Sequence, residues 1–192
     1  MRPLLAALAI ALTTTLAHAA NPMVELKTSA GTIVLELNAE KAPKTVENFT
    51  EYVRSGFYDG TVFHRVIDGF MIQGGGMTAD LKEKPTRAPI TNEAKNGLKN
   101  AVGTIAMART QEPHSATAQF FINLVNNAPL DYPSGDGWGY AVFGRVTQGM
   151  EVVNKIAQTP TTMVAPYRDV PVTPIVIQSA RLLPEAPAVK AK

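Results

Sequence analysis

A fixed cation and an amide stand among large apolar side chains in residues 63–76, whose sequence is FHRVIDGFMIQGGG. Arg65 stays protonated near neutral pH, so its guanidinium donates hydrogen bonds but serves as neither general acid nor general base. Gln73 adds an amide that can both donate and accept. This set is poorly suited to hydrolysis, but it can grip an uncharged, partly apolar group and polarise it. The segment therefore indicates chemistry on a peptide bond that is not cleaved.

A second segment offers the same pair of residue types. In an extended strand alternate side chains share a face, so Met71 lies beside Gln73, and Gln119 lies beside Phe121. One interpretation is that Met71 and Phe121 are ordinary core residues. The two amides favour a shared pocket instead, because a buried amide is costly without a partner.

Other residues that could carry chemistry have weaker support. His64 has no paired nucleophile, and His114 lies in a polar stretch where we expect it to be solvated. The histidines show no metal-ligand spacing with carboxylates, so we expect no metal and no other cofactor. The three glycines at 74–76 lack the lysine and following helix of a phosphate-binding loop, so we interpret them as a turn. A hydrolase has no nucleophile–base pair to support it.

The elements that must position these residues are mostly short strands. Alternating or β-rich runs predict strands at residues 23–28, 32–37, 62–67, 70–73, 103–108, 119–124, 141–146 and 175–183. Pro43 is well placed to begin a helix that carries Val46, Phe49 and Val53 on one face and ends at Gly56. A second helix is predicted to start near residue 149 and to stop before residue 160, with Val152, Val153 and Ile156 facing inward. Many short strands with two helices indicate a mainly β, antiparallel barrel or sandwich. Residues 80–99 and 126–139 are predicted to be long loops of the kind that often border a binding site.

Both ends of the chain differ in composition from the middle. One positive charge, a short apolar run and the sequence Ala17-His18-Ala19 are typical of a secretory signal peptide, which we place at residues 1–19. A buried N-terminal core helix is the alternative, but the three-part order argues against it. Cleavage after Ala19 leaves 192 − 19 = 173 residues, the size of one domain, which we place at 20–183. Residues 184–192 are rich in Pro, Ala and Lys, and we expect a disordered tail.

Charge and composition exclude several partners. Removal of Arg2 with the leader leaves 18 − 1 = 17 basic against 16 acidic residues, without any basic block, so nucleic acid is not an expected partner. The chain contains no cysteine, which excludes disulfides, thiol catalysis and cysteine metal sites. No second long apolar segment follows the leader, so we expect no membrane association after processing.

Several motifs together resemble the cyclophilins, the peptidyl-prolyl cis-trans isomerases. The match includes residues 63–67 and 69–75, the Gln-Phe-Phe-Ile at 119–122, the Val-Phe-Gly at 142–144 and the helix at 43–49. It extends from about residue 24 to residue 183 in the family's order, and is closest to the periplasmic bacterial cyclophilins, which share residues 103–109. The resemblance implies a closed eight-stranded antiparallel β-barrel capped by two α-helices.

The resemblance also implies roles for individual residues. Arg65 matches the catalytic arginine. The apolar proline pocket is matched by Phe70, Met71, Phe121 and Leu130, and its polar flank by Gln73 and Gln119. Ala108 and Arg109 match the strand edge along the substrate backbone. Tyr140 stands where many relatives carry histidine, and its hydroxyl could donate to the substrate.

The implied function is rotation about X-Pro peptide bonds, assisting the folding of exported proteins in the periplasm. The expected partners are proline-containing unfolded or flexible polypeptides, and we expect a monomer. The alternative is a proline-peptide-binding module or holdase chaperone in which turnover is incidental. Pro129 replaces the tryptophan that many cyclophilins carry before Leu-Asp and use to bind cyclosporin, so we expect weak cyclosporin binding. Trp138, in the inserted loop 132–139, is interpreted as a loop anchor rather than a substrate contact.

Overall fold

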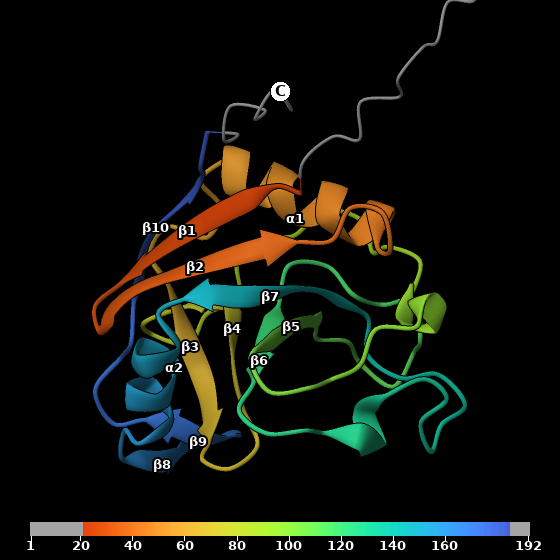
Figure 1. Ribbon diagram of the computed structural model, residues 1–192. Coiled ribbons are helices and arrows are strands. Elements are labelled where there is room, and N and C mark those ends of the chain that lie inside the picture. The colour runs from red at the N-terminus through yellow and green to blue at the C-terminus, as the bar shows by residue number, and fades with distance from the viewer. Residues whose placement is uncertain (1–20, 185–192) are drawn as a thin grey trace, which may run out of the picture.

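The computed structural model describes residues 21–184, so the predicted leader at 1–19 and all but the first residue of the predicted tail at 184–192 lie outside the described residues. Eight strands form one antiparallel sheet in the order β10-β1-β2-β7-β5-β6-β4-β3 (Figure 1). Their bounds are β1 Met23–Thr28, β2 Gly31–Leu37, β3 Thr61–Ile67, β4 Met71–Thr78, β5 Thr104–Met107, β6 Phe120–Asn123, β7 Val142–Gln148 and β10 Ile177–Leu182.

The two edge strands of this sheet, β10 and β3, meet and nearly close it into a barrel. Val62 forms an isolated antiparallel bridge with Val176, and Phe63 N–H donates to the carbonyl of Ile175 at 3.0 Å. Closure protects edges that would otherwise leave backbone groups unpaired. The predicted eight-stranded antiparallel barrel with two helices is confirmed.

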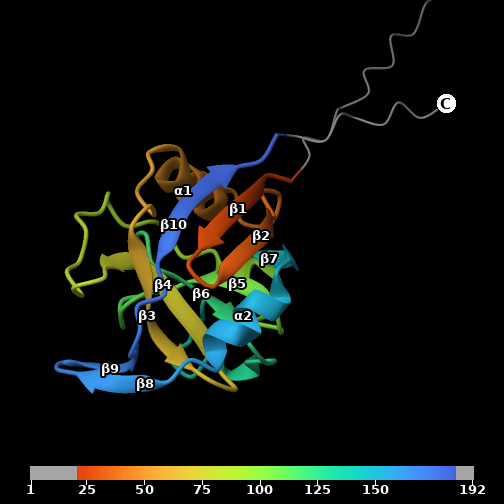
Figure 2. The ribbon, with the colours of Figure 1, turned by 90° about the vertical axis from the view of Figure 1, so that its left-hand side faces the viewer.

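Helix α1 (Pro43–Arg54) lies over one end of the barrel (Figures 1 and 2). Its predicted inward face is confirmed, because Val46, Phe49 and Val53 are all buried. The residue before the helix supplies no side-chain cap. Instead Glu93, far along the chain, accepts from the N–H groups of Lys44 and Thr45 at 3.2 and 2.8 Å. A carboxylate at this end satisfies free N–H groups and complements the helix dipole.

Helix α2 (Met150–Ala157) lies toward the other end of the barrel, and it stops before residue 160 as predicted. Val153 and Ile156 are fully buried, and Val152 packs against the same core while remaining partly exposed. Gly149 precedes the helix with φ of 88°, and a Cβ there would lie 2.2 Å from the carbonyl oxygen of Thr32. Glycine is therefore required where β7 passes into α2.

The barrel strands divide their side chains between two apolar clusters. The larger fills the barrel and includes the aromatic rings of Phe49, Phe120 and Phe143. The smaller lies on the other side of the sheet and consists of Met71, Ala106, Phe121 and Val142 with their partly buried neighbours. Because successive strand residues point to opposite faces, Phe120 enters the first cluster and Phe121 the second. The second cluster forms the floor of the site described below.

The predicted turn at the three glycines is wrong, because residues 74–76 continue strand β4. Neighbouring side chains fill the space where Cβ atoms would stand: a Cβ on Gly75 would lie 2.6 Å from the Phe120 ring, and one on Gly76 would lie 2.3 Å from Cγ of Gln119. Gly75 has a positive φ of 82°, and the β3–β4 register shifts along this stretch. The glycines thus serve close packing within an irregular strand.

The sequence prediction also missed a two-stranded hairpin near the C-terminal end of the domain. Strands β8 (Thr161–Val164) and β9 (Tyr167–Pro171) pair with each other outside the barrel sheet. Short 3-10 helices interrupt the predicted long loops, η1 at Ala94–Asn96 and η2 at Ala128–Leu130. In the described part of the chain, no helix is both long and apolar enough to cross a membrane.

Candidate active site

A cavity of about 210 Å³ on the outer face of the barrel gathers nine of the ten predicted site residues: Arg65, Phe70, Met71, Gln73, Ala108, Arg109, Phe121, Leu130 and Tyr140. The tenth, Gln119, borders it through a hydrogen bond from Gln73 Nε2 to Gln119 Oε1 of 3.0 Å. Residues separated by up to 75 positions in the chain are therefore brought together. Among them are Met71, Gln73 and Phe121, for which the two-strand argument predicted a shared pocket.

The strand half of the site is fixed by the sheet register. Arg65 pairs with Gln73 between β3 and β4, and Gln73 pairs with Phe121 between β4 and β6. Phe121 in turn pairs with Ala106 between β6 and β5. Residues directly opposite in a ladder project to the same face. The guanidinium, the amide and the aromatic ring therefore stand in one row across the sheet.

The floor of the cavity is apolar and well packed. Met71 and Phe121 are 2 % and 4 % exposed, and the Phe121 ring meets Tyr140 edge-on with 5.6 Å between centroids. Leu130, the last residue of η2, and Phe70, just before β4, complete the apolar wall and remain partly exposed. The arrangement can hold a compact apolar ring beside a fixed cation.

The side chain of Arg109 contacts the loop at 132–139. The sequence did not predict this contact. Its Nε donates to the carbonyl of Gly139 at 3.0 Å, and its guanidinium lies 4.6 Å from the centroid of the Tyr140 ring. A second nitrogen forms an ion pair with Asp136, and the Arg109 side chain is only 3 % exposed. Hydrogen bonds from Ser134 and then Arg109 lower the pKa of Asp136. Arg109 thus fixes the loop that carries Tyr140.

The predicted strand edge at Ala108 and Arg109 lies just beyond the end of β5 at Met107. The N–H of Ala108 is already used, since it donates to the carbonyl of Gln119 at 3.0 Å. Both residues line the cavity. Any contact with a substrate backbone would therefore involve groups other than that N–H.

A buried group of asparagines behind the cavity was also missed. Asn127 Nδ2 donates to the carbonyl of Phe70 at 2.9 Å and to Oδ1 of Asn123 at 2.7 Å. Asn123 in turn donates to Oγ1 of Thr104 at 3.0 Å. Satisfied buried networks of this kind fix loop positions. A signal existed in the sequence, because Asn123 lies near the end of the predicted strand 119–124 and Asn126 and Asn127 follow shortly after it.

His64 and His114 do not line this cavity. His64 is 5 % exposed, and its Nδ1 has no hydrogen-bond partner within residues 21–184. Burial lowers its pKa to about 4, so it is neutral at physiological pH. His114 is exposed as expected, yet its Nδ1 accepts from the N–H of Asn92 at 3.0 Å. Its ring meets Trp138 edge-on at 4.7 Å, consistent with the interpretation of Trp138 as a loop anchor.

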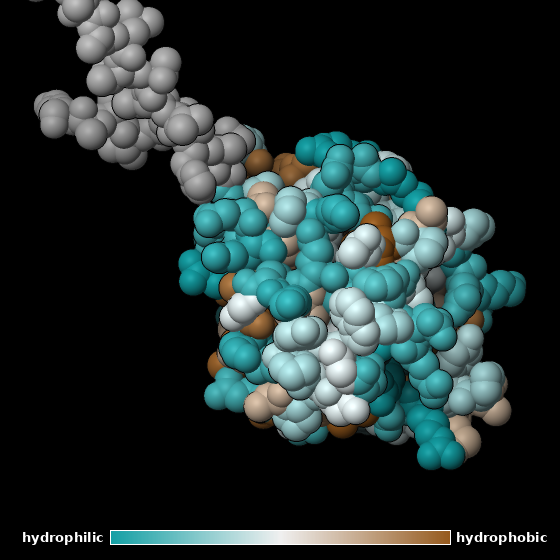
Figure 3. Space-filling model, turned by 90° about the vertical axis from the view of Figure 1, so that its right-hand side faces the viewer, coloured by the Kyte–Doolittle hydropathy of each residue, from teal (hydrophilic) through white to brown (hydrophobic). Residues whose placement is uncertain are grey.

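A larger cavity of about 370 Å³ lies elsewhere on the barrel, around β2 and β7. Its charged groups are Glu36, Arg145 and Lys99. Arg145 and Glu36 are bonded to each other at 2.6 Å, and Lys99 forms an ion pair of 3.6 Å with Asp131. Within the described residues no group of three or more potential metal ligands occurs. The surface on the loop side of the molecule is mainly hydrophilic, with only scattered apolar spots (Figure 3).

The protein is a nearly closed antiparallel barrel with an arginine, two amides and an apolar floor on its outer face. These features are those of a class of enzymes that act on peptide bonds without cleaving them. A family model described as cyclophilin type peptidyl-prolyl cis-trans isomerase/CLD matches residues 23–182. The chain therefore belongs to the cyclophilin-type peptidyl-prolyl cis-trans isomerases, and it is an isomerase of X-Pro peptide bonds.

Similar proteins agree with this assignment. The chain is 64 % identical to peptidyl-prolyl cis-trans isomerase cyp18 of Streptomyces antibioticus, over 83 % of this chain and 98 % of that protein. It is 59 % identical to peptidyl-prolyl cis-trans isomerase A of Dickeya dadantii, over 83 % of this chain and 84 % of the relative. A crystal structure of a cyclophilin-type isomerase from Cryptosporidium parvum superimposes with a TM-score of 0.71 at 26 % identity, covering 86 % of this chain and 99 % of the other.

Proposed function

We propose that Arg65 is the catalytic residue and that the cavity around Phe121 binds the proline ring of the substrate. The observation that carries this proposal is the single row of Arg65, Gln73 and Phe121 across three strands. Phe70, Met71 and Leu130 would contact the ring, Gln73 and Gln119 would hold the flanking peptide group, and Tyr140 would offer its hydroxyl. Ala108 and Arg109 would border the substrate backbone. A structure of a relative from Cryptosporidium parvum was determined in the presence of the dipeptide Ala-Pro, which supports an X-Pro ligand.

The mechanism follows from the electronic structure of the amide. Rotation about the C–N bond is opposed by a barrier of about 18–20 kcal/mol, because resonance must be broken. At the twisted transition state the proline nitrogen regains a lone pair that can accept a hydrogen bond. Arg65 would donate there, or stabilise the charge nearby, more strongly than in the planar ground state, which is the condition for catalysis. The apolar floor would hold the ring while the preceding carbonyl swings.

We further propose that the protein assists the folding of exported proteins in the periplasm after removal of residues 1–19. The N-terminal sequence supports export, and X-Pro isomerisation takes tens to hundreds of seconds without a catalyst, slow enough to limit folding. Intact-mass measurement of the exported protein should show cleavage after Ala19, and a retained leader would refute export by this route.

The folding role can be tested on an exported protein whose refolding is limited by proline isomerisation. Substoichiometric wild-type protein should accelerate the slow refolding phase, and Arg65→Ala should not. Equal acceleration by both proteins, or an effect only at stoichiometric amounts, would instead indicate a holdase chaperone without relevant turnover.

We propose that the processed protein is a soluble monomer that binds cyclosporin weakly. Pro129 lies exposed in η2, at the position where many cyclophilins carry tryptophan, and it lacks the indole N–H donor. Calorimetric titration with cyclosporin should give weak binding, and Pro129→Trp should strengthen it. Tight binding by the wild-type protein would contradict this proposal, and sedimentation would test the monomer.

A further inference from the structure

The unforeseen hairpin β8–β9 places a carboxylate beside Arg65. Strand β9 lies against β3 at the lower end of the barrel (Figures 1 and 2). The buried side chain of Val170 anchors β9, and the N–H of Val172 donates to the carbonyl of Pro160 at 2.9 Å across the base of the hairpin. Asp169, immediately before Val170, brings its Oδ2 to 3.8 Å from Nε of Arg65.

The carboxylate approaches the guanidinium from the side away from the proposed proline pocket. Another cavity, of about 430 Å³, lies between the hairpin and strands β3 and β4. Asp169 lines this cavity but not the proline pocket. Arg65 and Gln73 line both cavities, so they stand on the wall between the two. Asp169 can therefore hold Arg65 without occupying the space of the substrate.

The backbone at this position is also specialised. Asp169 has a φ of 59°, in the left-handed region that most side chains avoid and that Asp and Asn tolerate. The Arg65 and Asp169 side chains are 43 % and 41 % exposed, and the separation of 3.8 Å is beyond hydrogen-bond length. Such an exposed pair contributes little to stability. Its main physical consequence is to restrict the many rotamers of a long side chain.

We propose that Asp169 is a positioning residue that keeps the Arg65 guanidinium directed at the substrate peptide group. This proposal rests on the proposed catalytic role of Arg65. The negative charge of Asp169 also weakens the positive electrostatic potential of Arg65 at the substrate. This effect, taken alone, would slow catalysis. Positioning outweighs this effect, because Arg65 remains fully charged and its hydrogen bond to a neutral amide depends chiefly on geometry.

The test compares Asp169→Asn and Asp169→Gly with wild type in NMR exchange measurements on an uncharged X-Pro peptide. Asn removes the charge but keeps the size and tolerates the backbone conformation, while Gly removes the side chain and all strain. Both variants should lower kcat by about two- to fivefold, with KM unchanged within error and the melting temperature nearly unchanged. Raising the ionic strength from ~0.01 M to ~1 M should bring the wild-type kcat toward that of Asp169→Asn.

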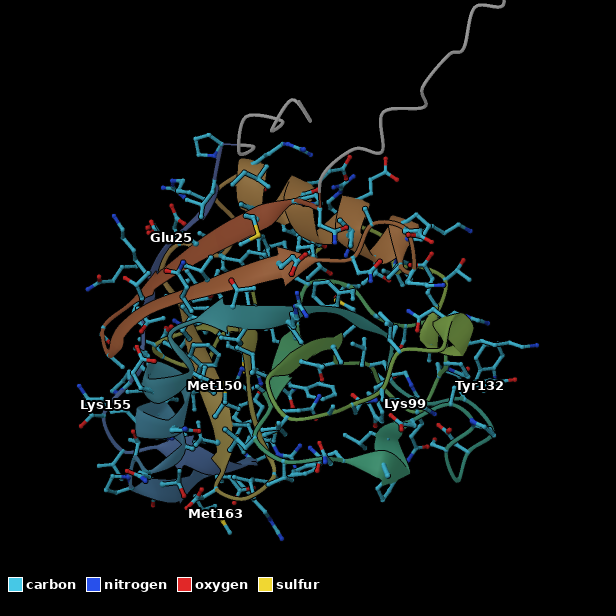
Figure 4. All side chains as sticks on the ribbon, viewed as in Figure 1. Glu25, Lys99, Tyr132, Met150, Lys155 and Met163 are labelled. Carbon is cyan, nitrogen blue, oxygen red and sulfur yellow. The ribbon has the colours of Figure 1, made fainter. Side chains whose placement is uncertain are left out.

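Two control variants separate positioning from general effects. Glu25→Gln removes a carboxylate from an ion pair of similar length, 3.6 Å to Lys27, on β1 at the other end of the barrel from the hairpin (Figure 4). Met163→Ala changes a side chain on β8 that is 64 % exposed and points into solvent. Both should retain wild-type kcat at every ionic strength.

The proposal is overturned if Asp169→Asn keeps or exceeds the wild-type kcat. It is also overturned if the variant loses activity through a higher KM at unchanged kcat. A loss in Asp169→Gly alone would show a backbone effect and overturns it too. The same assay on Arg65→Ala distinguishes this failure from that of the proposed function. If Arg65→Ala loses exchange activity while Asp169→Asn does not, only the positioning role is wrong; if Arg65→Ala remains active, the catalytic role is wrong.

Discussion

The two halves of the site are built in different ways. In the strand half, Arg65, Gln73 and Phe121 are held by backbone ladders and stand opposite one another in register. In the loop half, Leu130 and Tyr140 lie on irregular backbone that side-chain bonds hold in place, chiefly those of Arg109 and Asn127. Figure 4 labels Lys99 and Tyr132 on this loop side of the molecule. The backbone ladders of the strand half also support the fold, whereas the side-chain bonds of the loop half only shape the site.

The buried residues of the strand half, such as Phe121, belong to the apolar packing of the barrel, so a change at one of them should affect stability and activity together. The Arg65 side chain is 43 % exposed, so a change there should affect activity with little effect on stability. The loop half is connected to the barrel by a few polar contacts, so a change there should affect the site while the barrel stays folded. Local regions with fewer buried apolar contacts are the ones that open at low cost. The variants below test this contrast.

The largest effect is expected for Phe121→Ala in the strand half. Phe121 is 4 % exposed and packs in the cluster with Met71 and Val142, so the variant leaves a cavity. We expect a loss of about 3–5 kcal/mol in the free energy of unfolding, measured by urea titration, together with loss of exchange activity. Phe70→Ala, at the partly exposed rim, serves as the matched control and should cost less stability. Equal losses of unfolding free energy in the two variants would contradict the contrast between buried and exposed site residues.

A pH-dependent effect is expected for His64, which also lies on β3. Its pKa is about 4 in the folded protein against an ordinary value of 6.5, so between these pH values the unfolded chain binds a proton that the folded chain does not. The free energy of unfolding should therefore fall as the pH falls from 6.5 to 4, by up to about 3 kcal/mol from this group.

The variant His64→Gln should lose that part of the pH dependence, as measured by urea titration at several pH values. Its exchange activity at pH 7 should remain within the range of wild type, because rotation about the amide needs no proton transfer. If the free energy of unfolding of the variant kept the wild-type dependence on pH, His64 would not be the buried group that titrates.

The smallest effect on stability is expected for Arg109→Gln in the loop half. The variant loses the charged contacts to Gly139 and Asp136, which frees the loop that carries Tyr140. Hydrogen bonds to charged groups contribute about 1.5–3 kcal/mol, and here that energy holds the loop rather than the barrel, which can stay folded when the loop opens. KM should therefore rise by roughly tenfold or more while the melting temperature changes little. Arg145→Gln, which breaks an exposed pair with Glu36 on another face, is the matched control and should leave KM unchanged. A cooperative loss of the whole fold in Arg109→Gln would contradict the account.

The strand half was predictable from the sequence because its causes are local. Alternation places Met71 beside Gln73 on one strand and Gln119 beside Phe121 on another, and the structure joins the two pairs through a 3.0 Å amide bond. The glycines of β4 were misinterpreted, since their need for close approach depends on Phe120 and Gln119, side chains about 45 positions away.

The loop half and the hairpin were less predictable because their contacts are long-range. The cap that Glu93 provides for α1, the bond from Arg109 to Gly139 and the approach of Asp169 to Arg65 each join residues between 30 and 104 positions apart. No periodicity encodes such pairs. The resemblance named the residues of the loop half, while the structure shows how they are held.

The central claim is that Arg65 stabilises the twisted amide more than the planar one. The most direct test is the measurement of kcat and KM for Arg65→Ala by NMR exchange on an X-Pro peptide, with the melting temperature as a check on folding. We predict a fall in kcat of about 10²- to 10³-fold, the typical effect of removing one preorganised donor, with little change in KM or melting temperature. A near-normal kcat, or a loss confined to KM, would contradict the claim.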